Sequence, residues 1–281
     1  MTILVTGFTG KVGYEVAEKL KEEDLPFKCA VRNVEKAKEK YGESYEFVSL
    51  DFSKPVTFGA ALNGIDKIFL MYPPGDHLQF ERFIEKAKEE GVKHIVYLSL
   101  KDVQFMPFVH HYKNEKLIRN SLIPYTFLRA GYFMQNLNDF LHREIKERKR
   151  IFVPAGKGKT SFVDARDIAE LAMIALKDTA THTNKKYIVT GDEALDFYEV
   201  SQILSDVLQV KVEYTNPSVK DFKEYMVSRG EQKEFVNVVV GIHFPTKLGL
   251  AKGIRSDFEQ VAKRKPTKIR KYIEDYKESW I

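Results

Sequence analysis

Three glycines near the start of the chain, Gly7, Gly10 and Gly13, are spaced as in a phosphate-binding turn. They follow a short apolar run of β type and precede an amphipathic helical pattern. A strand, a glycine turn and a helix in this order can bind a phosphate group. The turn lets the backbone approach the phosphate, and the helix start supplies N–H donors and the positive end of a dipole. The pattern predicts a site for the pyrophosphate of a dinucleotide.

The spacing of these glycines is Gly-x-x-Gly-x-x-Gly rather than the Gly-x-Gly-x-x-Gly of common dinucleotide folds. In this form the run from Thr6 to Gly13 resembles the fingerprint of the extended and atypical short-chain dehydrogenases. The alternative interpretation is an ordinary strand-to-helix turn, in which the glycines only permit close packing.

Arg32 predicts which dinucleotide binds. In dinucleotide folds an acidic residue about 20 residues beyond the last glycine holds the ribose 2′-hydroxyl of NAD. Here Arg32 stands at the end of the second apolar run, 27–31. A guanidinium can pair with a 2′-phosphate, whereas a carboxylate would repel it. We therefore expect NADP(H) rather than NAD(H); a solvated arginine at a strand end is the alternative.

Short-chain dehydrogenases transfer a proton with a Tyr-x-x-x-Lys pair, because the lysine cation lowers the pKa of the tyrosine. Two literal matches occur, Tyr97 with Lys101 and Tyr112 with Lys116. Tyr97 lies inside an apolar strand pattern, which indicates packing. Tyr112 lies on the expected helix and is the better candidate.

The register of that helix argues against the dyad. In extended relatives the lysine precedes a glutamate by four residues and an Ile-Arg pair by seven and eight. This chain has Glu115, Ile118 and Arg119. Counting back puts the lysine position at His111 and the tyrosine position at Pro107. We expect the dyad to be absent, with His111 or solvent as the proton source; His111 as a helix residue paired with Glu115 is the alternative.

Strand and helix patterns alternate over the first 190 residues. Strands are expected at 3–6, 27–32, 45–51, 67–71, 94–99, 125–129 and 186–190. Helices are expected at 12–23, 34–41, 57–62, 77–90, 110–121, 134–148 and 166–177. Runs such as 68–71 and 95–98 are apolar on both faces, which is typical of parallel strands covered by helices on each side. The predicted fold is α/β, a Rossmann-type doubly wound parallel sheet.

The pattern loosens after Gly191. A helix at 197–208, a strand at 210–214, helices at 219–229 and 231–240, and two helices hinged at Pro266 are expected there. Residues 1–191 are interpreted as an NAD(P)-binding core. Residues 192–281 are interpreted as a smaller, mostly helical lid, packed on the carboxyl edge of the sheet and not an independent domain.

The composition of the chain indicates a globular protein. Of its 281 residues 43% are hydrophobic and 30% are charged, and no apolar run reaches the length of a membrane span. The single cysteine, Cys29, and the absence of a leader pattern favour the cytoplasm. A net charge of +5 is too mild to indicate nucleic acid. The seven histidines and one cysteine show no zinc-ligand spacing, so no metal is expected.

Several stretches together carry a more specific resemblance. They are His111-x-x-x-Glu115-Lys116-Leu117-Ile118, the run 123–136 (IPYTFLRAGYFMQN), the run 162–169 (FVDARDIA) and the run 263–267 (KRKPT). With them the chain resembles the NmrA-like atypical short-chain dehydrogenases over nearly its whole length. Within that family the NADPH-dependent quinone oxidoreductase branch is the most similar.

The resemblance implies a Rossmann core, NADP(H), and an active site between core and lid. Carried over position by position, it implies cofactor contacts for Gly7, Phe8, Thr9, Gly10, Lys11, Val12, Arg32, Asp51, Phe52, Met71, Tyr72, Pro73, Ser99, Gly131, Tyr132 and Phe133. The first six would meet the phosphates, and Arg32 the 2′-phosphate. Asp51 and Phe52 would flank the adenine, and Ser99 and the last three would face the nicotinamide.

Three functions follow from this resemblance. The first is reduction of a quinone or a similar flat, apolar molecule by direct hydride transfer. The second is an NADP(H)-sensing regulator that binds a protein partner without turnover, as some family members do. The third, a sugar-nucleotide epimerase, would need the Tyr-Lys dyad that the register does not support.

Overall fold

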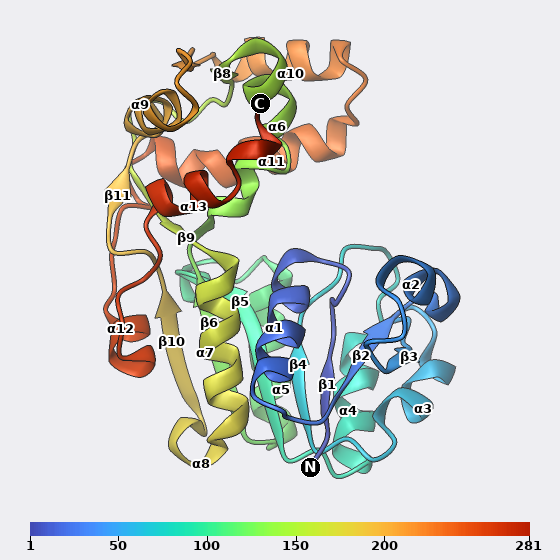
Figure 1. Ribbon diagram of the computed structural model, residues 1–281. Helices are drawn as coiled ribbons and strands as arrows, with labels where there is room; N and C mark the ends of the chain where they lie inside the picture. The colour runs from blue at the N-terminus through green and yellow to red at the C-terminus, as the bar shows by residue number, and fades with distance from the viewer. The chain divides into compact units, whose positions relative to one another are not determined.

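The computed structural model describes all residues from 1 to 281, and the chain divides into two compact units (Figure 1). The first unit consists of Met1–Ala130, Ala165–Val189 and Asp257–Arg264. The second unit consists of Gly131–Asp164, Thr190–Ser256 and Lys265–Ile281. The units interleave along the chain, whereas the predicted core and lid meet at a single boundary after residue 191. That boundary stays a prediction.

A seven-stranded sheet forms the centre of the first unit. Its strands are β1 (Ile3–Val5), β2 (Phe27–Val31), β3 (Phe47–Ser49), β4 (Lys67–Leu70), β5 (His94–Leu100), β6 (Tyr125–Ala130) and β10 (Lys185–Val189). They lie in the order β10-β6-β5-β4-β1-β2-β3, and every neighbouring pair is parallel. The chain order reverses where β1 lies between β4 and β2. This is the doubly wound arrangement, and the predicted fold class is confirmed.

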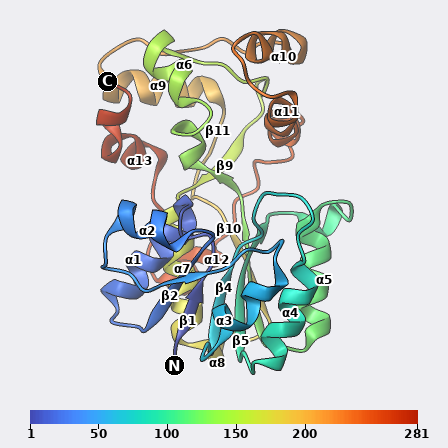
Figure 2. The ribbon, with the colours of Figure 1, turned by 90° about the vertical axis from the view of Figure 1, so that its right-hand side faces the viewer.

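Helices cover both faces of this sheet. They are α1 (Lys11–Glu22), α2 (Val34–Tyr41), α3 (Phe58–Leu62), α4 (Phe80–Glu89), α5 (His110–Ser121), α7 (Ala165–Lys177), α8 (Thr179–His182) and α12 (Asp257–Ala262), with 3-10 turns at η1 (Pro55–Thr57) and η2 (Val103–Phe105). Figure 2 shows α1 and α7 on one side of the sheet and α4 and α5 on the other. Because both faces are covered, Ile3–Val5 and Lys67–Leu70 are buried at every position.

The second unit is mostly helical. Its helices are α6 (His142–Arg148), α9 (Phe197–Leu208), α10 (Val219–Ser228), α11 (Lys233–Lys247) and α13 (Ile269–Asp275), with 3-10 turns at η3 (Met134–Leu137) and η4 (Lys277–Ser279). Its short strands are β7 (Tyr132–Phe133), β8 (Arg150–Ile151), β9 (Thr160–Val163), β11 (Ala194–Leu195) and β12 (Glu213–Tyr214). They pair as a three-stranded sheet, β11-β9-β7, and a two-stranded one, β12-β8.

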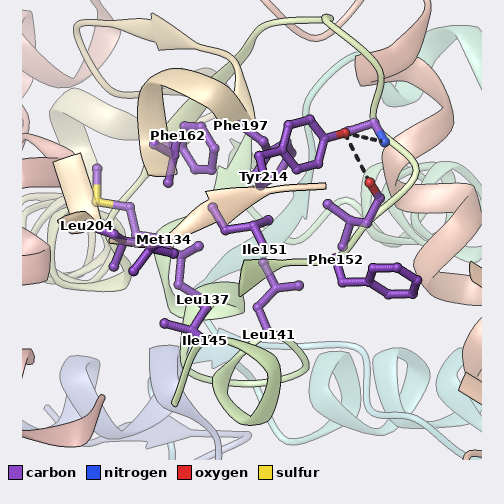
Figure 3. Packing of buried hydrophobic residues seen from close by; sticks show 14 of the residues in the cluster. Met134, Leu137, Leu141, Ile145, Ile151, Phe152, Phe162, Phe197, Leu204 and Tyr214 are labelled. Carbon is purple, nitrogen blue, oxygen red and sulfur yellow. Dashed lines mark hydrogen bonds between the residues drawn. The ribbon is translucent and has the colours of Figure 1, made fainter. Parts of the chain in front are cut away.

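The second unit has an apolar core of its own. Figure 3 shows Met134, Leu137, Leu141 and Ile145 gathered with Ile151 from β8. The Tyr214 hydroxyl reaches the backbone beside this cluster, where it donates to the Val153 carbonyl at 3.0 Å and accepts from the Ala155 N–H at 3.1 Å. A buried phenol with both bonds made carries no unsatisfied polar atom.

The helix predicted at 134–148 was wrong as a single element. The chain forms η3, then a non-helical stretch, and only then α6. Side chains of this stretch bind the carboxyl end of the chain: the Asn138 amide nitrogen donates to the Ser279 hydroxyl at 2.7 Å, and the Tyr272 hydroxyl donates to the Asn138 amide oxygen at 2.5 Å. These tertiary bonds override a continuous helical periodicity.

Helix α11 is longer than the predicted helix at 231–240, because it continues through Pro245 into its last turn. No helix of the structure combines the length and the apolar character needed to cross a membrane.

Candidate functional site

The glycine turn after β1 is exposed and tightly folded. Gly7 has a φ of +68°, a conformation that favours glycine, and the Gly10 N–H donates to its carbonyl at 2.9 Å. Gly10 is the N-cap of α1, and no side chain caps that helix. Gly7, Thr9, Gly10 and Lys11 are all exposed. The turn therefore presents backbone and the start of a helix to solvent, as an anion site requires.

Gly13 is needed for close packing. A Cβ atom at this position would lie 2.2 Å from the Gly7 carbonyl oxygen and 2.8 Å from the Phe8 nitrogen. Both are backbone atoms that cannot move aside. The third glycine thus lets α1 pack directly on the turn. A packing role for Gly13 is compatible with a phosphate site at the same turn.

Two residues of the turn have their side chains in the core. The Phe8 ring is fully buried, and its centroid lies 4.9 Å from those of Tyr41 and Tyr45. Val12 is buried on the inner face of α1. Only the backbone of these two residues is left for the predicted contacts with the cofactor.

Arg32 and Asp51 stand at the ends of neighbouring strands. Arg32 is exposed directly after β2. The pKa of Asp51, just beyond β3, is lowered, first by hydrogen bonds from Ser53 and then by the charges of Lys54 and Arg32. The next residue, Phe52, is buried in the apolar core instead of being exposed for an adenine ring.

Met71, Tyr72 and Pro73 follow β4. The Met71 N–H donates to the Thr6 hydroxyl at 2.8 Å. The Met71 sulfur lies only 2.7 Å from where a Cβ atom on Gly7 would be, so its side chain lies beside the glycine turn. Burial raises the pKa of Tyr72, whose ring stacks on that of His110 at 5.0 Å and 20°.

Ser99, near the end of β5, is bound into a buried ionic network. Its hydroxyl donates to the Glu115 carboxylate at 2.7 Å. Arg129 donates to the same carboxylate through Nε at 2.9 Å and through a terminal nitrogen at 2.7 Å. Its other terminal nitrogen donates to the Gln104 amide oxygen at 2.9 Å. Sequence reasoning missed this network; an arginine within the otherwise apolar strand 125–130 was the available signal.

His111 is held by Tyr97. The His111 Nδ1 atom lies 2.9 Å from the Tyr97 hydroxyl, and the Asn114 side chain donates to that hydroxyl at 3.1 Å. Burial lowers the pKa of His111 to about 4, so its ring is neutral at pH 7. Glu115, the partner of His111 in the alternative interpretation, forms its hydrogen bonds with Ser99 and Arg129 instead.

The two literal Tyr-Lys matches differ in exposure. Tyr97 is fully buried in β5, in keeping with a packing role. Tyr112 is half-buried and Lys116 is exposed on α5, and no hydrogen bond joins them. The absence of a working dyad stays a prediction.

The last three predicted contacts, Gly131, Tyr132 and Phe133, belong to the second unit. Tyr132 is buried there. The His243 Nδ1–H donates to the Val239 carbonyl at 2.8 Å, so its Nε2 atom accepts from the Tyr132 hydroxyl at 3.0 Å. The Tyr132 hydroxyl therefore has its hydrogen-bond partner inside the second unit.

The predicted contacts of the first unit share one edge of the sheet. They come at or just beyond the carboxyl ends of β1, β2, β3, β4 and β5. In parallel sheets these ends meet at one edge, and ligands bind there, where the strand order reverses. No group of three or more His, Cys, Asp or Glu residues is arranged to hold a metal ion.

The parallel sheet with an exposed glycine turn at its reversal point defines a dinucleotide-binding protein of the Rossmann class. The sequence model of the NmrA-like family matches residues 1–273. The chain belongs to the NmrA-like family.

Known relatives are similar over most of the chain. The NAD(P)H azoreductase of Xenophilus azovorans is 36% identical over 236 residues, which cover 81% of each protein. The triphenylmethane reductase of Citrobacter sp., solved in complex with NADP(H), superimposes with a TM-score of 0.86 at 27% identity, covering 98% of this chain and 99% of that one. The NADPH-dependent quinone oxidoreductase of Escherichia coli, solved with NADPH, gives 0.86 at 25% identity, with the same coverage.

These relatives are oxidoreductases named for, or crystallised with, NAD(P)H. The predicted class, an NADP(H)-dependent oxidoreductase of the NmrA-like family, is confirmed at that level.

Proposed function

We propose that this protein reduces a quinone, or another small, flat and apolar acceptor, with NADPH. The observation that carries the proposal is the exposed glycine turn, with Arg32 at the end of the adjacent strand β2. The named activities of the relatives, on azo compounds and quinones, support the class of acceptor.

The residues present fit NADP(H). An open backbone turn, an uncapped helix start and an exposed guanidinium are the donors that a pyrophosphate and a 2′-phosphate need. The contacts proposed in the first unit are those of Gly7, Thr9, Gly10, Lys11, Arg32, Asp51, Met71, Tyr72, Pro73 and Ser99. Phe8, Val12 and Phe52 are proposed to contribute through their backbone, because their side chains are buried. The contacts proposed in the second unit are those of Gly131, Tyr132 and Phe133. When bound, the reduced nicotinamide supplies the hydride.

An apolar acceptor is supported by two exposed aromatic side chains. Phe105 and Phe108 lie between β5 and α5, and each is 76% exposed. Gln104, beside Phe105, is anchored by Arg129, so this loop is tied to the sheet. Exposed aromatic rings on an anchored loop suit stacking with a flat molecule.

A direct hydride transfer needs no Tyr-Lys dyad. The acceptor takes up a hydride and then one proton, which solvent or one of the two histidines that begin α5, His110 and His111, would supply. We also propose a cytoplasmic location, on the ground of the single buried Cys29.

The test is NADPH oxidation, followed at 340 nm, with a panel of quinones and azo dyes. NADPH affinity is measured in parallel by calorimetry. Acceptor-dependent oxidation well above the enzyme-free rate is expected. Tight NADPH binding with no turnover of any acceptor would instead favour the NADP(H)-sensing regulator. Loss of all activity in Tyr112→Phe would show that Tyr112 and Lys116 act as the catalytic dyad after all.

A further inference from the structure

Two adjacent histidines begin α5, and their surroundings differ. His111 is held by Tyr97, and burial keeps its ring neutral. His110 is exposed, and no hydrogen bond engages its ring nitrogens. Of the two, only His110 is exposed and has both ring nitrogens free of a hydrogen bond.

The ring of His110 is held by a stacking contact. It lies 5.0 Å from the Tyr72 ring at an angle of 20°, so the two are nearly parallel. Tyr72 is fixed in turn by the edge of Phe80 at 5.5 Å. Because Phe80 is buried in the apolar core, the stack connects His110 to the rigid part of the first unit.

The position of this stack relates it to the proposed cofactor site. Tyr72 directly follows Met71, whose sulfur lies beside Gly7 in the glycine turn. Both members of the stack thus stand at the carboxyl edge of the sheet, where β4 and β5 end. This is the edge at which a ligand binds in such folds.

Other groups around the stack are poor proton donors. Burial raises the pKa of Tyr72, so its phenol holds its proton more firmly than usual. The Glu115 carboxylate is buried in its ion pair with Arg129. Imidazole is the side chain that most often acts as a general acid in enzymes, and the exposed His110 ring has no hydrogen-bond partner on either nitrogen.

We infer that His110 is the catalytic residue that protonates the reduced acceptor, with Tyr72 as the residue that positions it. This rests on the proposed function. A quinone that has received a hydride, with its two electrons, is a hydroquinone anion. The N–H bond of the His110 imidazolium breaks, an O–H bond forms on the anion, and the neutral imidazole regains a proton from water. For an azo compound the proton goes to the second nitrogen of the reduced N=N bond.

The experiment compares His110→Phe, which keeps a ring against Tyr72, with His110→Ala, which removes it. Both variants change an exposed side chain, and unfolding curves check that they fold. We expect kcat for the acceptor to fall about 100-fold in both. NADPH affinity should be unchanged. Added imidazole should restore turnover in His110→Ala and not in His110→Phe, because only alanine leaves space for it.

Two outcomes would overturn the inference in different ways. If wild-type protein reduces an acceptor and His110→Phe does so at the same kcat, His110 is not the proton donor and the proposed function stands. If His110→Ala loses activity without rescue by imidazole and His110→Phe keeps it, the ring is only structural. If the wild type turns over no acceptor, the proposed function itself fails.

Discussion

Arg129 grips Glu115 through two parallel hydrogen bonds, of 2.9 and 2.7 Å, and both side chains are buried. The pair joins strand β6 to helix α5. Ser99 adds strand β5, and Gln104 adds the loop that carries Phe105. One ion pair therefore fixes four elements at the carboxyl edge, where the acceptor is proposed to bind.

Replacing Glu115 by Gln should destabilise the protein strongly. The Arg129 guanidinium would remain buried without its counter-charge, which costs about 3–5 kcal/mol in comparable cases. Urea unfolding at pH 7.5 measures the loss. Glu89→Gln is the matched control, because Glu89 forms an exposed ion pair with Lys86 and should change stability by about 0.5 kcal/mol or less. Equal losses of unfolding free energy in the two variants would show that the buried pair of Glu115 and Arg129 stabilises the fold no more than an exposed ion pair.

The glycines of the turn should differ in their tolerance of alanine. A Cβ atom on Gly13 would strike backbone atoms at 2.2 and 2.8 Å, so Gly13→Ala should displace α1 and weaken NADPH binding at least tenfold. A Cβ atom on Gly10 meets only the Gly7 carbonyl, at 3.3 Å. Gly10→Ala should therefore lose much less stability than Gly13→Ala, so that its loss of NADPH affinity reports mainly on the space needed by the phosphates. Calorimetry and thermal unfolding separate the two effects.

Arg32→Glu should shift the preference from NADPH towards NADH. The new carboxylate would repel a 2′-phosphate and could accept from a ribose hydroxyl. We expect the ratio of the two dissociation constants to change by a factor of about 100, or about 2.8 kcal/mol. Lys40→Glu makes the same charge change at another exposed site, near the end of α2, and should leave the ratio as it is. An unchanged ratio in Arg32→Glu would remove the proposed role of this residue.

Buried histidines should make the protein sensitive to acid. Burial lowers the pKa of His94, His111 and His243 to about 4, from an ordinary value of 6.5. Because the unfolded chain binds these protons more readily, their neutral forms stabilise the fold above about pH 6.5. That stability falls as the pH drops from 6.5 towards 4.

His94 offers the clearest test of this dependence. The Thr126 hydroxyl donates to the His182 carbonyl at 2.8 Å, so the His94 Nε2–H must donate to that hydroxyl, at 2.9 Å. The His94 Nδ1 atom is then buried without a partner, and a proton there would have no acceptor. His94→Gln should reduce the slope of unfolding free energy against pH, between pH 6 and 4.5, by about 1 kcal/mol per pH unit. The unfolding free energy of each protein at pH 8 serves as its reference. A slope equal to that of the wild type would show that His94 does not cause the loss of stability in acid.

The sheet could be predicted almost completely from sequence. All seven strands and the helices at 34–41, 110–121 and 197–208 lie where the apolar periodicity placed them, because burial on both faces leaves a strong pattern. The break in the helix predicted at 134–148 could not be foreseen. It depends on Asn138 meeting Tyr272 and Ser279, more than 130 positions away in the chain.

The site was predictable in its backbone and less so in its side chains. The glycine turn and the position of Arg32 follow from local spacing. The different surroundings of His110 and His111 depend on which strand residues meet α5, and neither periodicity nor spacing encodes that. Phe8 and Phe52 show the same limit, since their positions at strand ends did not predict that their rings would be buried.

The interleaved units have a consequence for synthesis of the protein. The first unit is completed only by Asp257–Arg264: Asp257 accepts the Ile188 N–H at 2.6 Å, and Arg264 pairs with Asp167 at 2.7 Å. A nascent chain emerges from the ribosome amino end first. The first unit therefore lacks one of its segments until Arg264 has been made, and the second unit lacks one until Ile281 has been made. The glycine turn is among the first segments to be translated. The unit that contains it gains its last segment, Asp257–Arg264, only near the end of translation.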